Sequence, residues 1–307
     1  MADILYISCH AVLEYDELRL LTSLGHRIFS CGSYINPAAP GEGIRPPLRL
    51  HQDNEWIDIF HKTGCGGNPL VLSKEFLSKF DYIIVMHYHD FIFNNLKNFS
   101  KKNIVFWRGI GQSNHIIESK LKILKKSGIK LIRYSPFESK TPGFAGEDYL
   151  IRFYKKESEF KQIENKNLDG FLCYNGILQR QNFNDWNLSK DFILKNNFKI
   201  FGGSNESIDS SSRFLSPEEQ IHLYKSHSKI FCLSSFPAPY TLGFIEAVMS
   251  DAEIFVCKHG AEWDERFSFG QNYNRIQQNI YSFYPDKKIR ELFSERTAKL
   301  VWMKLLD

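Results

Sequence analysis

The stretch SKIFCLSSFPAPYTLGFIEAVMSDAEIFVCKHG, from Ser228 to Gly260, predicts a strand, a turn, a helix and a second strand. Ile230 to Leu233 is a short apolar run that suits a buried strand, and Glu253 to Cys257 is another. Pro237 and Pro239 end the first run, and Thr241 can cap the helix. The apolar residues after this cap recur with helical spacing: Leu242, Ile245, Val248 and Met249. The stretch therefore indicates one βαβ unit.

The turn before this helix has the features of an anion site. Gly243 places no Cβ in the first turn, and the free N–H groups of a helix start can hold a phosphate against the positive end of the helix dipole. Glu246 lies one turn beyond Leu242, where a carboxylate can accept hydrogen bonds from sugar hydroxyls. The alternative is a plain βα crossover, in which Glu246 is solvated and Gly243 only relieves packing.

Length and composition favour a globular chain of two domains. The chain has 307 residues, of which 43% are hydrophobic and 24% are charged. Its net charge of +4 suits anionic ligands such as nucleotide diphosphates, but it is too small to argue for nucleic acid. The six cysteines form no C-x-x-C pair and are interpreted as reduced thiols.

The N-terminus and the hydropathy pattern bear on location. The start MADILYIS lacks the basic region of a signal peptide, and no apolar run approaches 18 residues. We therefore expect a cytoplasmic protein without a transmembrane segment. Membrane contact through a surface patch stays open.

The first half of the chain alternates strands and helices, which predicts a parallel, doubly wound sheet. A Pro- and Gly-rich loop runs from Ser33 to Leu48, and the alternation resumes at Trp56 to Phe60. The strands are expected at Ile4 to Ser8, Arg27 to Cys31, Tyr82 to Met86, Ile104 to Trp107 and Lys130 to Arg133. The helices are expected at Glu14 to Leu24, Ser73 to Lys79 and His115 to Ser127. Residues 1–154 are predicted to form an N-terminal Rossmann-like domain.

The second half restarts the same pattern after a charged connector at 155–167. Strands are expected at Gly170 to Tyr174 and Lys199 to Phe201, and helices at Asp185 to Lys195 and Pro217 to Ser226. We predict a second Rossmann-like domain at 168–288 and a final helix, Ile289 to Leu306, that crosses back to the first domain within 289–307. The predicted fold class is α/β, with two Rossmann-like domains facing a cleft.

The wording PYTLGFIEAVMSD resembles the donor-nucleotide segment of GT-B glycosyltransferases, especially the retaining family 4 group. The residues that fall on that pattern are Gly243, Phe244, Glu246, Ala247 and Met249. The resemblance implies GT-B architecture and a glycosyltransferase that moves a hexosyl or pentosyl group from a nucleotide-diphosphate sugar to an acceptor hydroxyl. It implies no cofactor beyond this co-substrate, and the absence of any Asp-x-Asp pair speaks against a metal-dependent GT-A enzyme.

The resemblance also implies a donor site spread over three turns of the second domain. Arg180 falls where these families carry a diphosphate-binding cation, although Asp185 stands at the position of the expected lysine partner. The predicted donor-binding residues are Asn175, Gly176, Arg180, Gly202, Gly203, Tyr240, Thr241, Leu242, Gly243 and Glu246. As alternatives, Arg180 is a solvated loop residue and the glycine pair is an ordinary turn.

The sequence departs from the family pattern at Ala238, which occupies the place of the first of its two glutamates. That acid contacts the transferred sugar in the retaining group, so sugar identity and stereochemical outcome stay open. Tyr240 and Thr241 are the candidates to take over part of the contact. Two alternatives follow: a non-catalytic nucleotide-sugar binder or degenerate transferase, and a GT-B-like sugar-nucleotide epimerase.

In the first domain, the segment WRGIGQSNH ends a strand and opens a helix, a place where open parallel sheets bind ligands. Arg108 and His115 are therefore predicted, with Glu246, to be catalytic. His10, Gln112 and Ser113 are predicted to contact the acceptor or line the cleft. The alternative for His115 is a surface residue at a helix start.

Two further features concern ligands of the first domain. His87, His89 and Asp90 follow a strand, but no separate acid or Cys at ligand spacing supports a metal there, so none is predicted. The acceptor is expected to be a glycan or a lipid-linked glycan. A modified DNA base is the lesser alternative, favoured only if the lysines between Lys97 and Lys126 form a basic groove.

Overall fold

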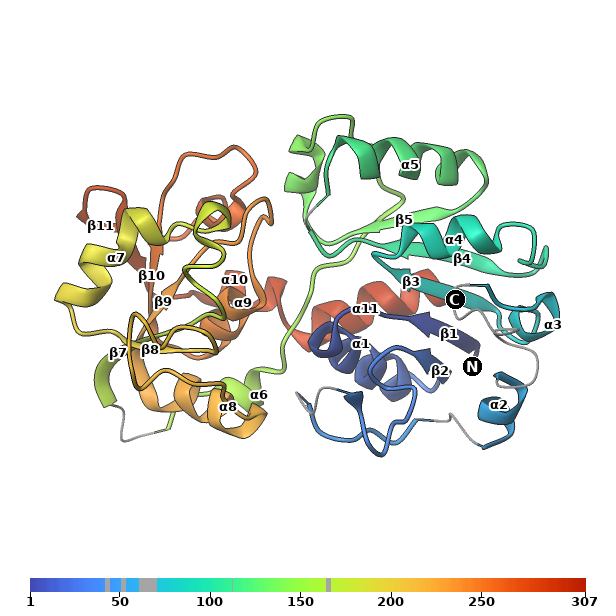
Figure 1. Cartoon of the computed structure of the whole chain (residues 1–307), viewed down its shortest axis with the longest axis horizontal. Coiled ribbons are helices and arrows are strands. Elements are labelled where there is room, and N and C mark those ends of the chain that lie inside the picture. The colour runs from blue at the N-terminus through green and yellow to red at the C-terminus, as the bar shows by residue number, and fades with distance from the viewer. Residues whose placement is uncertain (42–44, 51–53, 61–70, 112, 164–166) are drawn as a thin grey trace. The chain divides into compact units, whose positions relative to one another are not determined.

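The computed structural model describes residues 1–41, 45–50, 54–60, 71–111, 113–163 and 167–307. The chain divides into two compact units (Figure 1). The first contains Met1–Ile151 together with Lys299–Asp307, and the second contains Arg152–Ala298. Each unit is built on one six-stranded sheet.

The sheet of the first unit is entirely parallel, with the strand order β2-β1-β3-β4-β5-β6. Its strands are β1 (Asp3–Ile7), β2 (Arg27–Cys31), β3 (Tyr82–Met86), β4 (Ile104–Arg108), β5 (Lys130–Arg133) and β6 (Tyr149–Leu150). The order reverses beside β1, because β1 pairs with β2 on one side and with β3 on the other. This is the topological switch point at which doubly wound sheets bind ligands.

Helices cover both faces of this first sheet. They are α1 (Ala11–Ser23), α2 (Asn54–Ile59), α3 (Lys74–Leu77), α4 (His89–Asn95) and α5 (His115–Lys126), with a 3-10 turn at Pro136–Lys140. Apolar residues of α3, α4 and α5 join the core cluster that holds Leu5, Val85 and Leu131. Tyr6 points to the opposite face, where its hydroxyl bonds Glu17 of α1.

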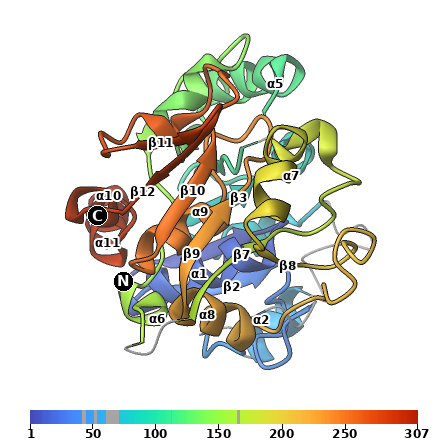
Figure 2. The same cartoon turned by 90° about the vertical axis from the view of Figure 1, so that its left-hand side faces the viewer.

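The second sheet has the order β11-β12-β10-β9-β7-β8. Figure 2 shows its central strands side by side. The strands are β7 (Asn167–Cys173), β8 (Lys199–Phe201), β9 (His227–Cys232), β10 (Glu253–Cys257), β11 (Asn274–Gln277) and β12 (Ile280–Phe283). β7 to β10 are parallel and switch order beside β7, whereas β12 and β11 add an antiparallel edge that the sequence analysis did not predict.

The helices of the second unit also lie on both faces of its sheet. They are α6 (Glu157–Phe160), α7 (Trp186–Lys195), α8 (Pro217–Ser226), α9 (Leu242–Met249) and α10 (Lys287–Leu292), with 3-10 turns at Gln181–Phe183 and Glu265–Phe267. On one face, Phe192 of α7 packs against Phe231. On the other, Tyr224 of α8 contacts Phe171, and Phe244 of α9 contacts Phe283. The prediction of an α/β fold with two parallel-sheet Rossmann-like domains is confirmed.

One local prediction needs correction. The expected single helix from Ile289 to Leu306 is two helices, α10 and α11 (Glu295–Leu306). The first helix stops because the carbonyl of Phe293 accepts a hydrogen bond from the Lys155 N–H. The second starts because Ser294 Oγ accepts from the Thr297 N–H. A side chain that accepts in this way starts a new helix. The apolar run at Trp56 to Phe60 falls mostly within helix α2.

Candidate functional site

The carboxyl ends of β7, β8 and β9 carry the predicted donor residues of the second unit. The loop after β7 holds Asn175, Gly176 and Arg180, and the loop after β8 holds Gly202 and Gly203. The loop after β9 leads into helix α9. Since β7 lies between β8 and β9, all three loops leave the same edge of the sheet around its switch point.

The N-terminus of α9 has two free backbone donors. Thr241 caps the helix by accepting from the Phe244 N–H through Oγ1 at 3.2 Å, and its carbonyl accepts from Ile245. Within the described part of the chain, no group accepts from the N–H of Leu242 or of Gly243, and both residues are partly exposed. Two donors at the positive end of a helix are suited to bind an anion.

Hydrogen bonds join the loops after β7 and β8. Asn175 Oδ1 accepts from the Gly203 N–H at 3.0 Å, and the Gly176 N–H donates to the Gly203 carbonyl at 2.9 Å. The buried Asn205 amide donates to the carbonyls of Tyr174 and Gly202. The structure therefore brings Asn175, Gly176, Gly202 and Gly203 into one rigid corner of the sheet edge.

The two glycines of this corner have packing reasons of their own. Gly202 has a φ of +113°, and a Cβ there would lie 2.3 Å from the Tyr174 carbonyl oxygen. A Cβ on Gly203 would lie 2.0 Å from the ring of Phe214. The chain itself thus fills the space beside both glycines, so close approach of a nucleotide is not needed to explain them.

Arg180 and Asp185 lie in different environments. The Arg180 side chain is exposed at the end of the loop after β7. Asp185 is buried just before α7, where it accepts from the Ser234 N–H at 3.0 Å and lies 3.3 Å from Arg266 Nη2. Asp185 therefore connects the start of α7 to the loop that follows β9.

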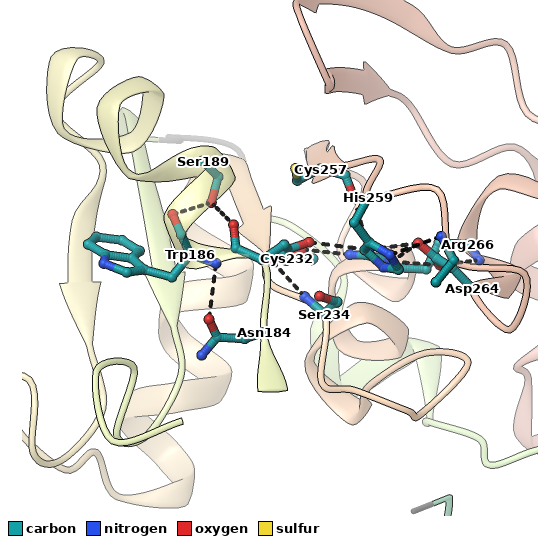
Figure 3. Close-up of polar contacts among 11 residues, drawn as sticks. Asn184, Trp186, Ser189, Cys232, Ser234, Cys257, His259, Asp264 and Arg266 are labelled. Atoms are coloured by element: carbon teal, nitrogen blue, oxygen red, sulfur yellow. Dashed lines mark hydrogen bonds and ion pairs between the residues drawn. The ribbon is translucent and has the colours of Figure 1, made fainter. Parts of the chain in front are cut away.

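Arg266 is the centre of this buried network, part of which is drawn in Figure 3. Its guanidinium binds both oxygens of Asp264 at 2.9 Å and donates to the carbonyls of Cys232 and Cys257, each at 3.0 Å. Those carbonyls end β9 and β10, so one side chain holds both strand ends. Burial raises the pKa of Asp264, but the charge of Arg266 and the hydrogen bonds from Arg266 and His259 together outweigh it and hold that pKa far below its usual range.

His259 completes the network beside Asp264. Its Nε2 lies 3.0 Å from Asp264 Oδ2, and its Nδ1 accepts from the Ala261 N–H at 3.2 Å. The ring also packs between Phe236 and Trp263, with centroids 4.6 and 4.8 Å away. These contacts make His259 a support for the loop after β10.

Glu246 is buried beneath the α9 N-terminus and is held by protein groups. Its Oε1 lies 3.1 Å from Lys155 Nζ, and both residues are only 2% exposed. Its Oε2 accepts from Gln220 Nε2 at 2.8 Å. The expected sugar-binding carboxylate is therefore engaged inside the unit, and Lys155, placed by the sequence analysis in a solvated connector, is its buried partner.

Tyr240 lies just before the cap of α9 and is held by Arg152. The guanidinium of Arg152 lies over the rings of Tyr240 and Phe269, and it pairs with Glu265 through two bonds of 3.1 and 2.5 Å. Arg152 and Lys155 belong to the same short segment. This segment therefore fixes both the residue before the predicted anion site and the acid beneath it.

In the first unit, His10 and His87 follow the two strands that flank the switch point. His10 caps α1, with Nδ1 3.5 Å from the Leu13 N–H. His87 follows β3 with a φ of +64°, and burial lowers the pKa of its imidazole. Both residues are partly exposed. They mark the edge at which this sheet is expected to take a ligand.

Arg108 and Ser113 are placed inside the unit. Arg108 is fully buried, and its Nε donates to Glu17 Oε1 at 2.9 Å. Ser113 donates to Glu118, whose carboxylate also binds Arg133 through bonds of 2.9 and 2.8 Å. These pairs hold the carboxyl ends of β4 and β5 to the helices around them.

Glu138 is a second buried acid at this edge. Its Oε2 accepts from the N–H groups of Tyr134 and Ser135, while Oε1 has no hydrogen-bond partner among the described residues and lies 3.7 Å from Arg133 Nη1. Burial raises the pKa of this carboxyl to about 7, against the opposing charge of Arg133. Glu138 therefore titrates near neutral pH.

The remaining first-unit candidates are at the surface or outside the described chain. His115 is exposed at the first position of α5. Gln112 lies outside the described residues. His89 Nε2 lies 3.1 Å from Lys120 Nζ, which also bonds Asp90 at 2.9 Å, so a lysine ammonium occupies the space between these two residues.

Sequence reasoning missed the buried residues that position the donor loops, namely Lys155, Arg266, Asp264 and His259. The apolar neighbours of Lys155, Phe153 and Tyr154, are a local sign that its segment is buried. Arg266 follows no motif, because its partners are carbonyls of strands that lie far away in the sequence. Charged residues of this kind are recognised only when their partners are known.

In the described part of the chain, no helix combines the length and the hydropathy needed to cross a bilayer.

No model of a known protein family matches this chain, and no curated protein matches its sequence. The chain is similar to the crystal structure of a glycosyltransferase from Rickettsia africae ESF-5, with a TM-score of 0.54 and 12% identity over 99% of this chain and 97% of that one. It also resembles the crystal structure of the GtfA/B complex, with a TM-score of 0.50 and 10% identity over 76% of this chain. It spans 59% of that second chain. The likeness is one of fold: two parallel-sheet Rossmann-like units, as in GT-B glycosyltransferase structures.

Proposed function

We propose that this chain is a glycosyltransferase that uses a nucleotide-diphosphate sugar as donor. The observation that carries the proposal is the pair of free N–H groups at Leu242 and Gly243, at the switch-point edge of the second sheet. A dinucleotide or nucleotide diphosphate binds at this kind of place in open α/β sheets. The fold shared with a known glycosyltransferase directs the proposal toward sugar transfer.

The diphosphate is assigned to the α9 N-terminus. The N–H groups of Leu242 and Gly243 donate to it, and the exposed Arg180 supplies the cation. As the bond between the anomeric carbon and the diphosphate oxygen breaks, charge grows on that oxygen. Fixed dipoles and a guanidinium placed there stabilise the charge without reorganisation.

The acceptor is assigned to the first unit, at the edge marked by His10 and His87. The acceptor oxygen forms a bond to the anomeric carbon, its proton leaves to a base, and the nucleotide diphosphate departs. A glycan or lipid-linked hydroxyl fits this reaction. The proposal requires no metal, because the helix terminus and Arg180 carry the charge stabilisation.

A second candidate function is a nucleotide-sugar binder without turnover. Two observations favour it. Ala238 offers no carboxylate to the sugar, and Glu246 is engaged by Lys155 and Gln220. In this alternative the diphosphate site is the same and only the transfer step is lost.

Donor binding is tested first by thermal shift with UDP, GDP, ADP and CDP sugars. A ligand that binds only the folded chain raises the free energy of unfolding by about 2.7 kcal/mol at about one hundred times its Kd. A melting temperature that no nucleotide sugar moves would sink both candidate functions.

The site itself is tested with Leu242→Pro. Leu242 is the first helical residue after an extended Thr241, where proline is tolerated and removes the N–H in question together with a partly exposed side chain. We expect donor affinity to fall about tenfold or more, as for loss of a charge-assisted hydrogen bond, with the melting temperature of the free protein kept. Arg180→Ala should behave alike, whereas Arg275→Ala, an exposed arginine on β11, is the matched control.

Transfer and binding are separated by following a sugar nucleotide with a labelled sugar. Release of free labelled sugar or its appearance on an acceptor supports the transferase. Saturable binding with neither product supports the binder.

A further inference from the structure

Phe214 is the most exposed phenylalanine of the described chain, with 69% of its surface open to solvent. It lies in the connection between β8 and α8. One side of its ring nevertheless rests on Gly203, so closely that a Cβ on this glycine would lie 2.0 Å from the ring. The ring is therefore packed on one side and open on the other. Such a ring offers a surface on which a second flat group can stack.

Hydrogen bonds fix the connection that carries this ring, which folds back beside β8 (Figure 2). The Gly202 N–H donates to the Arg213 carbonyl at 3.0 Å, and Ser212 Oγ donates to the Gly202 carbonyl at 2.8 Å. Arg213 Nη1 donates to the Phe214 carbonyl at 3.1 Å, and the same guanidinium pairs with Glu219. A ring that is already fixed loses little conformational entropy when it binds a ligand.

The ring lies at the same edge of the second sheet as the free N–H groups of Leu242 and Gly243. Since β7 lies between β8 and β9 and neighbouring strands are about 4.8 Å apart, the ends of β8 and β9 are separated by about 10 Å. A nucleoside diphosphate with its phosphates at the start of α9 can extend its ribose across the end of β7. Its base then reaches the end of β8, where Gly203 and the ring are found.

A free backbone donor follows directly after Gly203. Ser204 is exposed and has a φ of +63°. Its carbonyl accepts from Gln179 Nε2 at 3.3 Å, but no group in the part of the chain that the structure describes accepts from its N–H. A free N–H beside an open aromatic ring suits a flat ligand with acceptor atoms at its edge. Nucleobases have both features.

We propose that the open side of the Phe214 ring stacks on the nucleobase of the donor. This inference rests on the proposed function, because the phosphates at α9 determine where the base falls. The donor contact predicted at Gly202 and Gly203 then passes through the side chain that covers Gly203. Every base has a face that can stack on an aromatic ring, so Phe214 supplies affinity, and the choice between bases falls to the polar groups around it.

The test compares nucleoside diphosphates with inorganic pyrophosphate, which lacks the base. Binding of UDP, GDP, ADP, CDP and pyrophosphate to the full-length chain is measured by calorimetry. Phe214→Ala should weaken the binding of each nucleoside diphosphate that the parent binds by about tenfold, as for loss of one stacked base. Its affinity for pyrophosphate should equal that of the parent. Phe214→Tyr keeps an aromatic face and should restore nucleotide binding.

Tyr284→Ala is the matched control. Tyr284 is also a highly exposed aromatic residue, at 65%. It follows Phe283, which pairs with Ile254 at the beginning of β10, so it lies at the opposite edge of the sheet from the donor loops. Its removal should change neither nucleotide nor pyrophosphate binding. Both aromatic residues are exposed, so unchanged melting temperatures verify that the variants fold.

Phe214→Trp gives a direct signal of stacking. A base stacked on the new indole should quench its fluorescence, and the difference from the parent isolates this signal from the native tryptophans. Nucleoside diphosphates should produce the quenching and pyrophosphate should not. A residue that only supports the loop would give no such difference between the two ligands.

The outcomes separate this inference from the proposed function. If Phe214→Ala binds every nucleoside diphosphate as the parent does, or loses nucleotide and pyrophosphate alike, stacking on Phe214 is overturned while the diphosphate site stands. The same holds if the parent binds nucleoside diphosphates no more tightly than pyrophosphate. A parent that binds none of these ligands overturns the proposed function as well. Loss of nucleotide binding alone, with restoration by Phe214→Tyr, supports the inference.

Discussion

Glu246 Oε1 lies 3.1 Å from Lys155 Nζ with both side chains buried, which ties the first segment of the second unit to helix α9. The acid that a sugar would be expected to contact is thus also part of the packing of the unit. Its two oxygens are shared between Lys155 and Gln220. A change at Glu246 alone therefore mixes an effect on stability with any effect on the donor, so Leu242 and Arg180 are the better probes of function.

The pair itself makes the first prediction. Lys155→Met leaves a buried carboxylate and Glu246→Leu leaves a buried ammonium, so each should lower the free energy of unfolding by about 3 to 5 kcal/mol. The double variant should cost less than the sum of the two, because no unpaired charge remains. Urea unfolding followed by tryptophan fluorescence measures this cycle. Lys199→Met, from an exposed pair with Asp169, is the control and should change little. Additive single costs would show that the two groups do not interact.

Glu138 predicts a pH-dependent stability. Burial raises the pKa of its carboxyl from about 4.5 to about 7, so the folded chain holds this proton where the unfolded chain has lost it. Its contribution to the free energy of unfolding is present in full below about pH 4.5 and falls as the pH rises to about 7. A glutamine side chain in its place cannot ionise, so the stability of Glu138→Gln relative to the parent should improve across this window by on the order of 3 kcal/mol.

Urea unfolding of the parent and of Glu138→Gln across that range of pH tests the prediction. Glu147→Gln, an exposed acid just before β6, is the control. A constant difference between Glu138→Gln and the parent would show that Glu138 stays ionised in the folded chain.

Alanine substitutions at Gly202 and Gly260 can distinguish the cost of a strained backbone from the cost of a steric clash. Both have positive φ values, +113° and +79°, but only at Gly202 would a Cβ meet another atom, the Tyr174 oxygen at 2.3 Å. Gly260→Ala should cost about 1 to 2 kcal/mol for the left-handed backbone alone. Gly202→Ala should cost at least about 2 kcal/mol more, because the strand ends must move apart. Equal losses in melting temperature would contradict the packing reason given for Gly202.

We predict that a positive charge alone at position 266 does not preserve the stability of the chain. Arg266→Lys keeps the charge but loses the bidentate bond to Asp264 and at least one of the bonds to the carbonyls of Cys232 and Cys257. We expect a loss of about 3 kcal/mol in the free energy of unfolding. Arg213→Lys, at an exposed bidentate pair with Glu219, should change little. A stable Arg266→Lys chain would show that the network is not a strand-end support.

The local sequence pattern was enough to predict the bounds of a strand or helix where those bounds depend on the element's own residues. The strands Tyr82–Met86 and Lys130–Arg133 and the helix Pro217–Ser226 have the bounds expected from apolar runs, Gly punctuation and a proline after a capping serine. Local pattern failed at β12, which needs β10 beside it, and at the break after Leu292, which needs the N–H of the distant Lys155.

The candidate site divides in the same way. The turn at Thr241 to Gly243 could be predicted from sequence because capping and free N–H groups are properties of one helix end. The corner around Gly202 could be expected as a glycine turn, but the reason for its glycines is the backbone of another loop.

The amino-acid sequence by itself thus determined most of the strands and helices, the class of fold and the place of the capped turn at Thr241, because these follow from periodicity and capping over a few residues. Only the tertiary structure decided the state of the charged groups. Glu246 and Arg108 are read from sequence as catalytic side chains, and Asp185 as the residue in place of an expected lysine, yet each is buried against a partner far away in the chain. Burying such a charge carries a large desolvation cost, which only a nearby partner of opposite charge can offset. That partner is distant in the sequence and is brought near only by folding.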